Sequence, residues 1–262
     1  MRPAPTMPPS VPTVPLRLAI AVCAYVLLVV WLSLRGLERG LERSDCAAPV
    51  RRSILVRLGA LLATWFIAIT AAATAGAWLD PSFPRPVGYI LPALVLACVL
   101  WRAGWLTAAV DALPLWCIPA LQMLRIGGGL TLFGAWATGF APWAFVGTAG
   151  VGDIAVGVTA GLVAMALAAQ TGWAVTAARL WNVAGLADMA HTMYRAARTA
   201  PGPLQLSFDG PPNLVPALFP LIYLPAFIVP LTILLHLLSL QQLARHAAGV
   251  SSSSGARSSS AP

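Results

Sequence analysis

The sequence contains no lysine, and only 9% of its 262 residues are charged. A soluble domain normally carries about 25% charged residues, so a chain this poor in charge cannot cover a water-facing surface. The missing lysine excludes a retinal Schiff base and any lysine nucleophile, because both need a lysine amine. The composition therefore predicts an integral membrane protein that is not a retinal-binding opsin.

Patterns that hold a metal, a haem or a disulfide framework are also missing. The four cysteines show no CxxC spacing, and the three histidines show neither HxxxH nor HExxH spacing. His191 and His236 fall near the outer and inner ends of different expected helices, too far apart vertically to share one iron. The serines in or beside the hydrophobic stretches lie far from Asp188 and His191, which disfavours a serine–histidine hydrolase. We expect no metal and no cofactor.

The sixteen arginines give the chain a formal net charge of +8. Such an excess can indicate a nucleic-acid partner, but many of these arginines gather between or beside the first two hydrophobic stretches. That group is Arg35, Arg39, Arg43, Arg51, Arg52 and Arg57. Positive charge at this position is typical of a cytoplasmic loop facing anionic lipid. The expected partner is the lipid bilayer, and nucleic acid is not expected.

Hydrophobic residues make up 59% of the chain, and they form stretches long enough to cross a bilayer, which takes about 20 residues. We predict an all-α polytopic transmembrane bundle with about seven spans and no separate soluble domain. The bundle occupies 15–241, between a proline-rich N-terminus (1–14) and a serine-rich tail (242–262), both expected to be disordered. The expected spans are 15–34, 54–78, 87–110, 116–138, 151–170, 173–195 and 218–241.

Counting arginines on alternate sides orients this bundle. With seven spans, the arginine-rich first loop and the C-terminal tail share one side, and the loops on the other side are poorer in arginine. The positive-inside rule then places the N-terminus outside and the C-terminus inside. The expected location is a bacterial cytoplasmic membrane.

The last expected span is interrupted by prolines. Pro216, Pro220, Pro225 and Pro230 recur through it at short intervals. Proline kinks a helix and frees backbone carbonyls, which membrane proteins tolerate where neighbours or a cavity satisfy them. We predict that this segment is bent or partly unwound at its outer end.

Arg125 lies deep in the fourth expected span, and Gln122 stands on the same face. An arginine at this depth needs a partner or a route for its side chain to the interface. Asp153 in the next span and Asp188 in the one after are the expected partners. Asp153 also has a purely structural interpretation, since a carboxylate in the first turn of a helix that begins near 151 suits the positive end of the helix dipole.

Asp188, His191 and Arg195 are spaced three and four residues apart in the sixth expected span, so they share one face of a helix. Asn182 lies about a third of a turn from that face. A carboxylate beside an imidazole can position it or shift its pKa for acid–base work. The alternative is that Arg195 is an anchor at the membrane interface and His191 a packing residue.

The segments LQMLRIGG and GFAPWAFVGTAGVGDIAVGVTAGLVA resemble a region of uncharacterised bacterial multipass membrane proteins. RLWNVAGLADMA and LPAFIVPLTILLHLLSLQQL are similar to later segments of the same proteins. The resemblance covers roughly 115–243. It implies a multipass helical membrane protein and no particular activity.

These observations leave three functional hypotheses open. The first is an intramembrane polar site that binds or permeates a small solute, a proton or a lipid-like molecule. The second is a membrane-embedded enzyme acting on a lipid or isoprenoid, in which Asp153, Asp188 and His191 do acid–base work and Arg125 holds an anionic group. The third is a non-catalytic subunit or assembly factor. No catalytic residue is assigned; the candidate polar site comprises Arg125, Asp153, Asp188, His191, Asn182 and Gln122.

Overall fold

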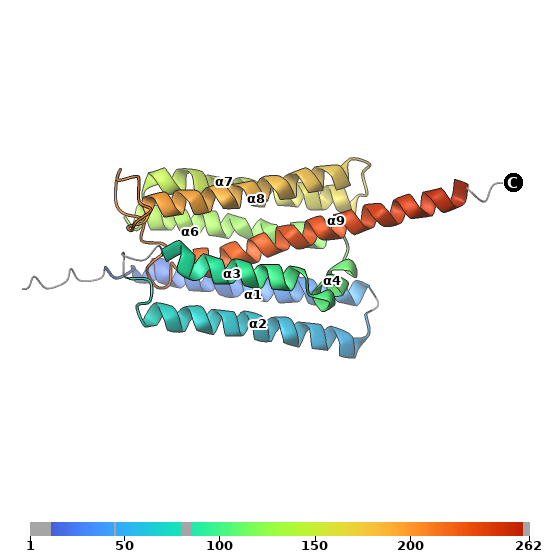
Figure 1. Ribbon diagram of the computed structural model, residues 1–262, viewed down its shortest axis with the longest axis horizontal. Coiled ribbons are helices and arrows are strands. Elements are labelled where there is room, and N and C mark those ends of the chain that lie inside the picture. The colour runs from blue at the N-terminus through green and yellow to red at the C-terminus, as the bar shows by residue number, and fades with distance from the viewer. Residues whose placement is uncertain (1–11, 45, 80–84, 259–262) are drawn as a thin grey trace, which may run out of the picture.

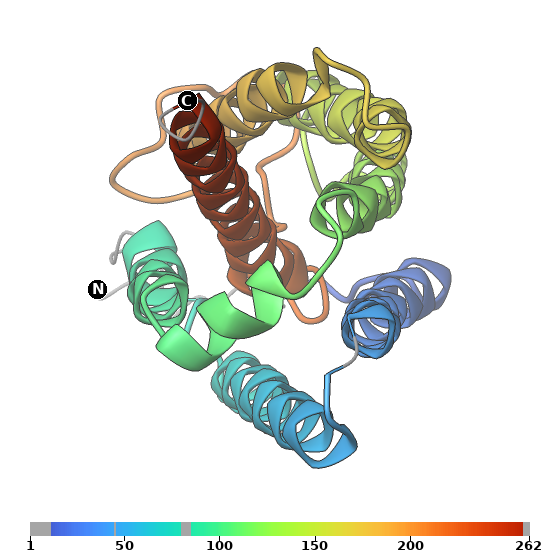
Figure 2. The same ribbon diagram turned by 90° about the vertical axis from the view of Figure 1, so that its right-hand side faces the viewer.

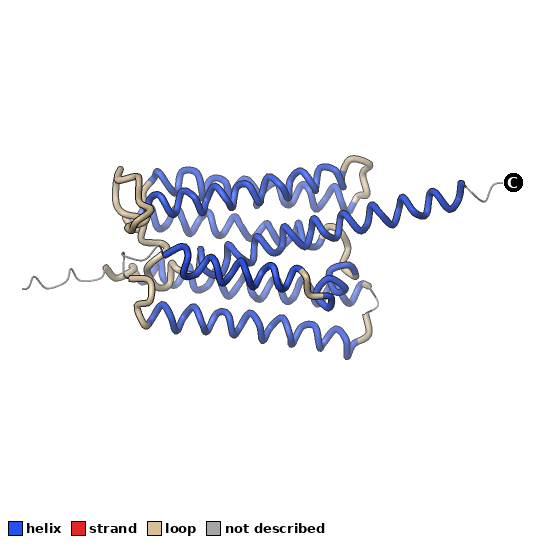
Figure 3. The backbone as a smooth tube through the Cα atoms, in the orientation of Figure 1, coloured by secondary structure: helices blue, strands red, loops and turns tan. Residues whose placement is uncertain are grey.

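The computed structural model describes residues 12–258, apart from 45 and 80–84. Every regular element in that part is a helix, so the predicted all-α class is confirmed. The long helices run side by side along one axis, and the loops join them at the two ends (Figure 1, Figure 3). The elements are α1 (Leu16–Arg43), α2 (Ala48–Thr74), α3 (Arg85–Trp101), α4 (Gly104–Asp111), α5 (Cys117–Leu121), the 3-10 turn η1 (Gln122–Leu124), α6 (Arg125–Ala137), α7 (Trp143–Ala168), α8 (Ala174–Thr199), the π-helical turn η2 (Leu224–Ile228) and α9 (Val229–Ser258).

Four helical segments in the described part of the chain are long and apolar enough to cross a membrane. They are α1, α2, α7 and the segment Leu224–Ala248. A fifth arises if Ile90–Trp101 in α3 and α4 count as one broken span, because the two helices meet at an angle of 66°. These lengths and compositions are compatible with a membrane protein. The remaining expected spans correspond to α5, η1 and α6 taken together, and to α8.

Helix α9 occupies the centre of the bundle. Viewed along the bundle axis, the other long helices surround its first part (Figure 2). In its most apolar window 61% of the residues are buried, against 17–33% in α1, α2 and α7. The surface helices leave much of their apolar surface exposed, as expected where the neighbour is lipid rather than water. Thr232, His236, Ser239 and Gln242 in the first part of α9 are therefore enclosed by protein.

Helix α7 begins at Trp143, not near 151. The glycine-rich run before Asp153 suggested a loop, but these glycines lie inside the helix at close contacts. A Cβ on Gly150 would meet the Phe133 ring at 3.3 Å, and one on Gly152 would overlap the Asp188 side chain. The dipole interpretation of Asp153 is therefore wrong, because the residue lies well past the first turn, where its neighbours are side chains.

The segment before α9 is irregular, as its prolines predicted. Pro216 and Pro220 lie in turns, Pro225 lies in the π-helical turn, and Pro230 lies in the first turn of α9, where a missing backbone donor costs least. At the other end α9 continues to Ser258, although we expected disorder from 242. The run QQLARHAA contains good helix formers, which explains the continuation of the helix through 248. Residues 1–11 and 259–262 of the expected disordered termini lie outside the described residues.

The two ends of the bundle differ in charge. One end carries the end of α1, the start of α2, the α7–α8 loop and the C-terminal part of α9 (Figure 1). Most of the described arginines belong to these segments, and we call it the arginine-rich end. The opposite end carries the loops 138–142 and 200–223. These two ends define the axis along which the site is described below.

Candidate functional site

Arg125, at the junction of η1 and α6, is the centre of a buried polar cluster. Its side chain is only 2% exposed. The guanidinium donates from Nε to Asp153 Oδ1 at 2.8 Å, and its Nη2 lies 2.7 Å from the same oxygen. Nη2 also pairs with Asp188 Oδ2. The structure thus joins Arg125 to both carboxylates that the sequence suggested, one from α7 and one from α8.

Glycines on α6 and α7 allow the two carboxylates to come this close to Arg125. A Cβ on Gly128 would lie 3.4 Å from Asp153 Oδ2, and a Cβ on Gly152 would overlap the Asp188 carboxylate. The Cβ on Gly128 would also lie 3.1 Å from the Tyr25 hydroxyl, which donates to the Leu124 carbonyl at 3.0 Å and so ties α1 to the start of α6. The glycines of α6 and α7 therefore bring three helices close enough to share one arginine.

His236 of α9 completes the cluster. Its Nδ1 lies 2.9 Å from Asn182 Oδ1 on α8, and its Nε2 lies 3.5 Å from Arg125 Nη1. Asn182 Nδ2 donates to the Ala178 carbonyl at 2.8 Å and to Ser239 Oγ at 3.0 Å. A backbone carbonyl can only accept, so the amide nitrogen must point that way and Oδ1 must accept from His236. The imidazole is therefore protonated at Nδ1 and presents its Nε2 lone pair to Arg125.

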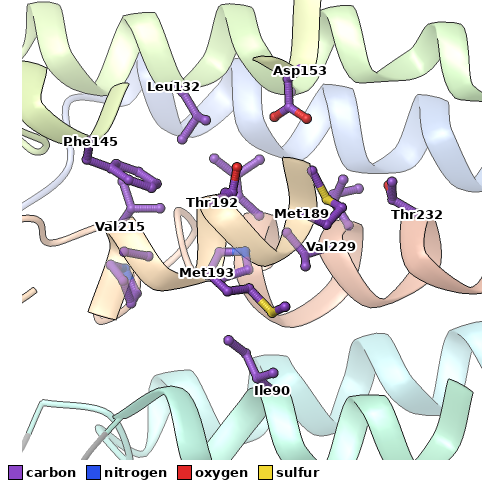
Figure 4. A pocket seen from close by; sticks show the side chains of 16 residues that line it. Ile90, Leu132, Phe145, Asp153, Met189, Thr192, Met193, Val215, Val229 and Thr232 are labelled. Carbon is purple, nitrogen blue, oxygen red and sulfur yellow. The ribbon is translucent and has the colours of Figure 1, made fainter. Parts of the chain in front are cut away.

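A cavity of about 40 Å³ lies beside the cluster. The Asp153 carboxylate points into it, and Thr192 and Thr232 are among its lining residues (Figure 4). Most of the remaining lining is apolar and includes Leu132, Phe145, Met189, Met193 and Ile90. The cavity extends to Val215 and Pro216 in the loop before η2. It thus leads from Asp153 toward the end opposite the arginine-rich one.

The cluster continues toward the arginine-rich end along one face of α9. Thr232, His236, Ser239 and Gln242 follow one another at intervals of four, three and three residues, and all four are buried. Gln242 Nε2 donates to the carbonyls of Val110 and Leu113, at 2.6 Å and 2.7 Å, beside the end of α4. We call these four residues the α9 polar stripe.

Of the sequence-predicted site residues, His191 lies apart from this cluster, and Gln122 contacts only the backbone of the α9 polar stripe. His191 is exposed, its ring neighbour is Tyr194 at 6.5 Å, and no hydrogen bond joins it to Asp188 among the described residues. Gln122 is buried, but its amide donates to the Thr232 carbonyl at 3.1 Å. Arg195, from the same helical face as Asp188, donates to the Ala144 carbonyl and so ties α8 to α7.

Sequence reasoning missed His236 and Ser239 as members of the site. The depth of His236 relative to His191 argues only against a shared haem iron and leaves other roles of His236 open. The signal that identifies it is the polar stripe itself, since four polar residues recur at helical spacing in an otherwise apolar run. Such a stripe predicts a face of α9 that contacts other polar groups.

The comparison with known families places this cluster in a shared domain. Residues 82–244 match the family described as Domain of unknown function (DUF8737). The chain belongs to this DUF8737 family. The DUF8737 domain includes α3 to α8 and most of α9, and hence Arg125, Asp153, Asn182, Asp188 and His236. No curated protein and no solved structure matches the chain.

The packing of His236 gives a first prediction. A Cβ on Gly185 would overlap the imidazole of His236, which Asn182 and the Trp181 ring at 5.2 Å hold in place. Gly185→Ala should lower the free energy of unfolding by about 1–3 kcal/mol, because the pinned ring cannot move away. Thermal unfolding of the detergent-purified protein measures this.

The matched control is Gly59→Ala in α2, where a Cβ would meet nothing within 4 Å. That change should leave the melting temperature unchanged or raise it, because alanine favours a helix by about 0.5–1 kcal/mol. Equal melting temperatures for the two variants would mean that His236 is not held against α8 as described.

Proposed function

We propose that the protein is a multipass protein of a bacterial cytoplasmic membrane with seven crossing segments. Four or five of these meet the length and hydropathy requirements, and α8 and the α5–α6 segment run parallel to them (Figure 3). Residues 117–137 amount to roughly 32 Å of helix, close to the thickness of the hydrocarbon layer. The arginine-rich end lies in the cytoplasm, which puts the N-terminus outside and the C-terminus inside.

Within this membrane protein, we propose that the polar cluster binds a proton at Asp153 and passes it along the α9 polar stripe. The observation that carries the proposal is the charge balance at Arg125. One guanidinium lies between two carboxylates, and the imidazole beside it presents a lone pair instead of a charge. With Arg125 and both carboxylates ionised and the imidazole neutral, the cluster would carry a net charge of one negative unit. In apolar surroundings a charge without a partner is costly. A proton or a small cation neutralises it.

The cavity favours the proton over a larger ligand. One water needs about 10–15 Å³ of such space, so about 40 Å³ holds only a few waters. A lipid or a drug-sized solute typically needs a pocket of about 300 Å³ or more. Asp153 points into the cavity, whereas Asp188 is not among its lining residues. We therefore assign the proton to Asp153.

The α9 polar stripe supplies the path beyond the cluster. Thr232 lines the cavity, His236 touches Arg125, Ser239 bonds Asn182, and Gln242 reaches the end of α4. Carboxylate and imidazole groups relay protons across membranes, and hydroxyls and waters can carry the proton between them; the Gln242 amide can only orient the last water of such a chain. The stripe runs from the cavity side of Arg125 toward the arginine-rich end.

Proton flux into proteoliposomes tests this function. Vesicles that contain the protein and an internal pH-sensitive dye receive a potassium-diffusion potential, and the rate of internal acidification is measured. Asp153→Asn should reduce the protein-dependent rate by about tenfold or more, because the amide cannot take up the proton. Asp209→Asn, which removes a carboxylate from the exposed loop before α9, should leave the rate unchanged.

Three outcomes would reject the proposal. A wild-type rate equal to that of empty vesicles means that no proton crosses. Equal rates for wild type and Asp153→Asn mean that the proton does not use Asp153. Acidification that requires an added organic amine means that the cavity serves a cation other than the proton.

A further inference from the structure

A groove between α1 and the α5–η1 segment lies away from the polar cluster. Its volume is about 430 Å³. Arg35, Arg39 and Arg43 border it, spaced four residues apart and therefore on one face of α1. Its remaining lining is largely apolar: Leu32, Gly36, Gly40, Trp116, Cys117, Ala120, Leu121, Met123 and Leu124. The groove thus combines a basic border with an apolar floor.

The arginines of this groove are available to a ligand. Arg35 is paired with Glu38 at 2.9 Å. Arg39 and Arg43 have no carboxylate within 4.0 Å among the described residues, and both side chains belong to exposed residues. The Arg43 guanidinium lies over the Trp116 ring, 5.5 Å from its centroid, which holds it at the border of the groove. Two guanidinium groups therefore remain for an anion.

The groove has the shape of an amphipathic slot. From Leu32 to Arg43 along α1 it extends by roughly 17 Å at the helical rise. Arg43 is the last residue of α1, at the arginine-rich end, whereas Leu32 lies near the middle of that helix. Glycine allows α1 to approach closely here, because a Cβ on Gly40 would overlap the Leu113 side chain. The charged part of the groove therefore lies where the headgroup of a lipid in the cytoplasmic leaflet would lie, and the apolar part lies where its acyl chains would lie.

We propose that this groove is a binding site for an anionic phospholipid. The phosphodiester pairs with Arg39 and Arg43, and one acyl chain lies on the floor formed by Ala120 and Leu121. Arginine donates to phosphate oxygens in a forked geometry, and clusters of basic residues at the cytoplasmic surface attract anionic lipid. The proposal rests on the membrane placement given above, and it is independent of the proton path.

Native mass spectrometry of the delipidated, detergent-solubilised protein tests the site. Dioleoyl phosphatidylglycerol is titrated and compared with dioleoyl phosphatidylcholine, which carries the same chains without net charge. We expect one phosphatidylglycerol to bind at concentrations where phosphatidylcholine does not. Replacing Arg39 and Arg43 together with glutamine should weaken this binding by about 30-fold.

The control variant also removes two positive charges from the arginine-rich end. Arg52 and Arg57 on α2 border a different surface, so changing both to glutamine should alter the affinity by about twofold or less. Ala120→Trp fills the floor without changing charge and should also weaken binding. If both double glutamine variants lost the same affinity for phosphatidylglycerol, the lipid would be attracted by the general positive charge of this end, and the proposed site would be wrong.

Other outcomes also overturn the proposal. Inorganic phosphate that competes at the same concentration as the lipid would show an anion site without an acyl chain. A stable dimer that Ala120→Trp disrupts would show that a second copy occupies the groove. If the protein could be extracted without detergent, the membrane placement would be wrong. A protein that needs detergent but binds no phosphatidylglycerol would contradict only the lipid site.

Discussion

Arg125→Met should leave little folded protein in the membrane. The substitution keeps the length of the side chain but leaves Asp153 and Asp188, which are 15% and 19% exposed, without their shared cation. Removing one partner of a buried ion pair costs about 3–5 kcal/mol. The whole stability of a typical domain is about 5–15 kcal/mol. Abundance in the membrane fraction and thermal unfolding in detergent measure the loss.

Two further variants separate charge from packing. Arg102→Met removes an exposed arginine at the end of α3 and should change stability by about 0.5 kcal/mol or less. Adding Asp153→Asn and Asp188→Asn to Arg125→Met removes the unpaired charges and should restore much of the abundance. If the triple variant is as unstable as the single one, the arginine stabilises the fold through shape and not through its two ion pairs.

His236→Leu should slow proton transfer by about tenfold or more, because leucine has no ring nitrogen that can take up a proton from a water in the cavity and release it toward the Ser239 hydroxyl. The imidazole is fully buried and contacts Arg125 and Asn182. The same proteoliposome assay measures the rate. Some stability is lost as well, since Asn182 Oδ1 loses its partner at a cost of about 1–3 kcal/mol.

A matched pair of serines provides the control for the stripe. Ser239 and Ser33 are both buried, but Ser239 accepts from Asn182, whereas Ser33 Oγ has no hydrogen-bond partner in the part of the chain that the structure describes. Ser239→Ala should slow proton transfer, and Ser33→Ala should leave it unchanged. If both serine variants, or His236→Leu, transferred protons at the wild-type rate, the α9 polar stripe would not be the path.

The sequence predicted the helical class and the central ion pairs for a simple physical reason. An arginine in an apolar helix must find a carboxylate, and Asp153 and Asp188 were the available ones in the following helices. The prolines before α9 likewise predicted its irregular start, because proline removes a backbone donor wherever it stands. These inferences depend on the chemistry of single residues and hold without knowledge of the packing.

Features that depend on packing escaped the sequence. Glycines before Asp153 indicated a loop, but in α7 they allow the close approach of Phe133 and Asp188. His191 shares a helical face with Asp188, yet it is exposed, because the face of α8 that meets α9 carries Asn182 and Gly185. His236 belongs to the site because α9 is the central helix and brings the imidazole to Arg125. Helix order in the bundle is not encoded in the periodicity of any one segment.

The protonation of Asp153 is the central claim, and infrared difference spectroscopy measures it directly. The protein in lipid nanodiscs is titrated with acid while the stretching band of protonated carboxyl groups is recorded in H₂O and D₂O. The chain has eight acidic side chains, all of which protonate at low pH. We therefore expect one component of the carboxyl band, at the higher frequency of a carboxyl shielded from water, that grows as the pH falls, shifts in D₂O, persists in Asp209→Asn and is absent in Asp153→Asn. Survival of that component in Asp153→Asn, or its absence from the wild type while the protein remains folded, would contradict the account.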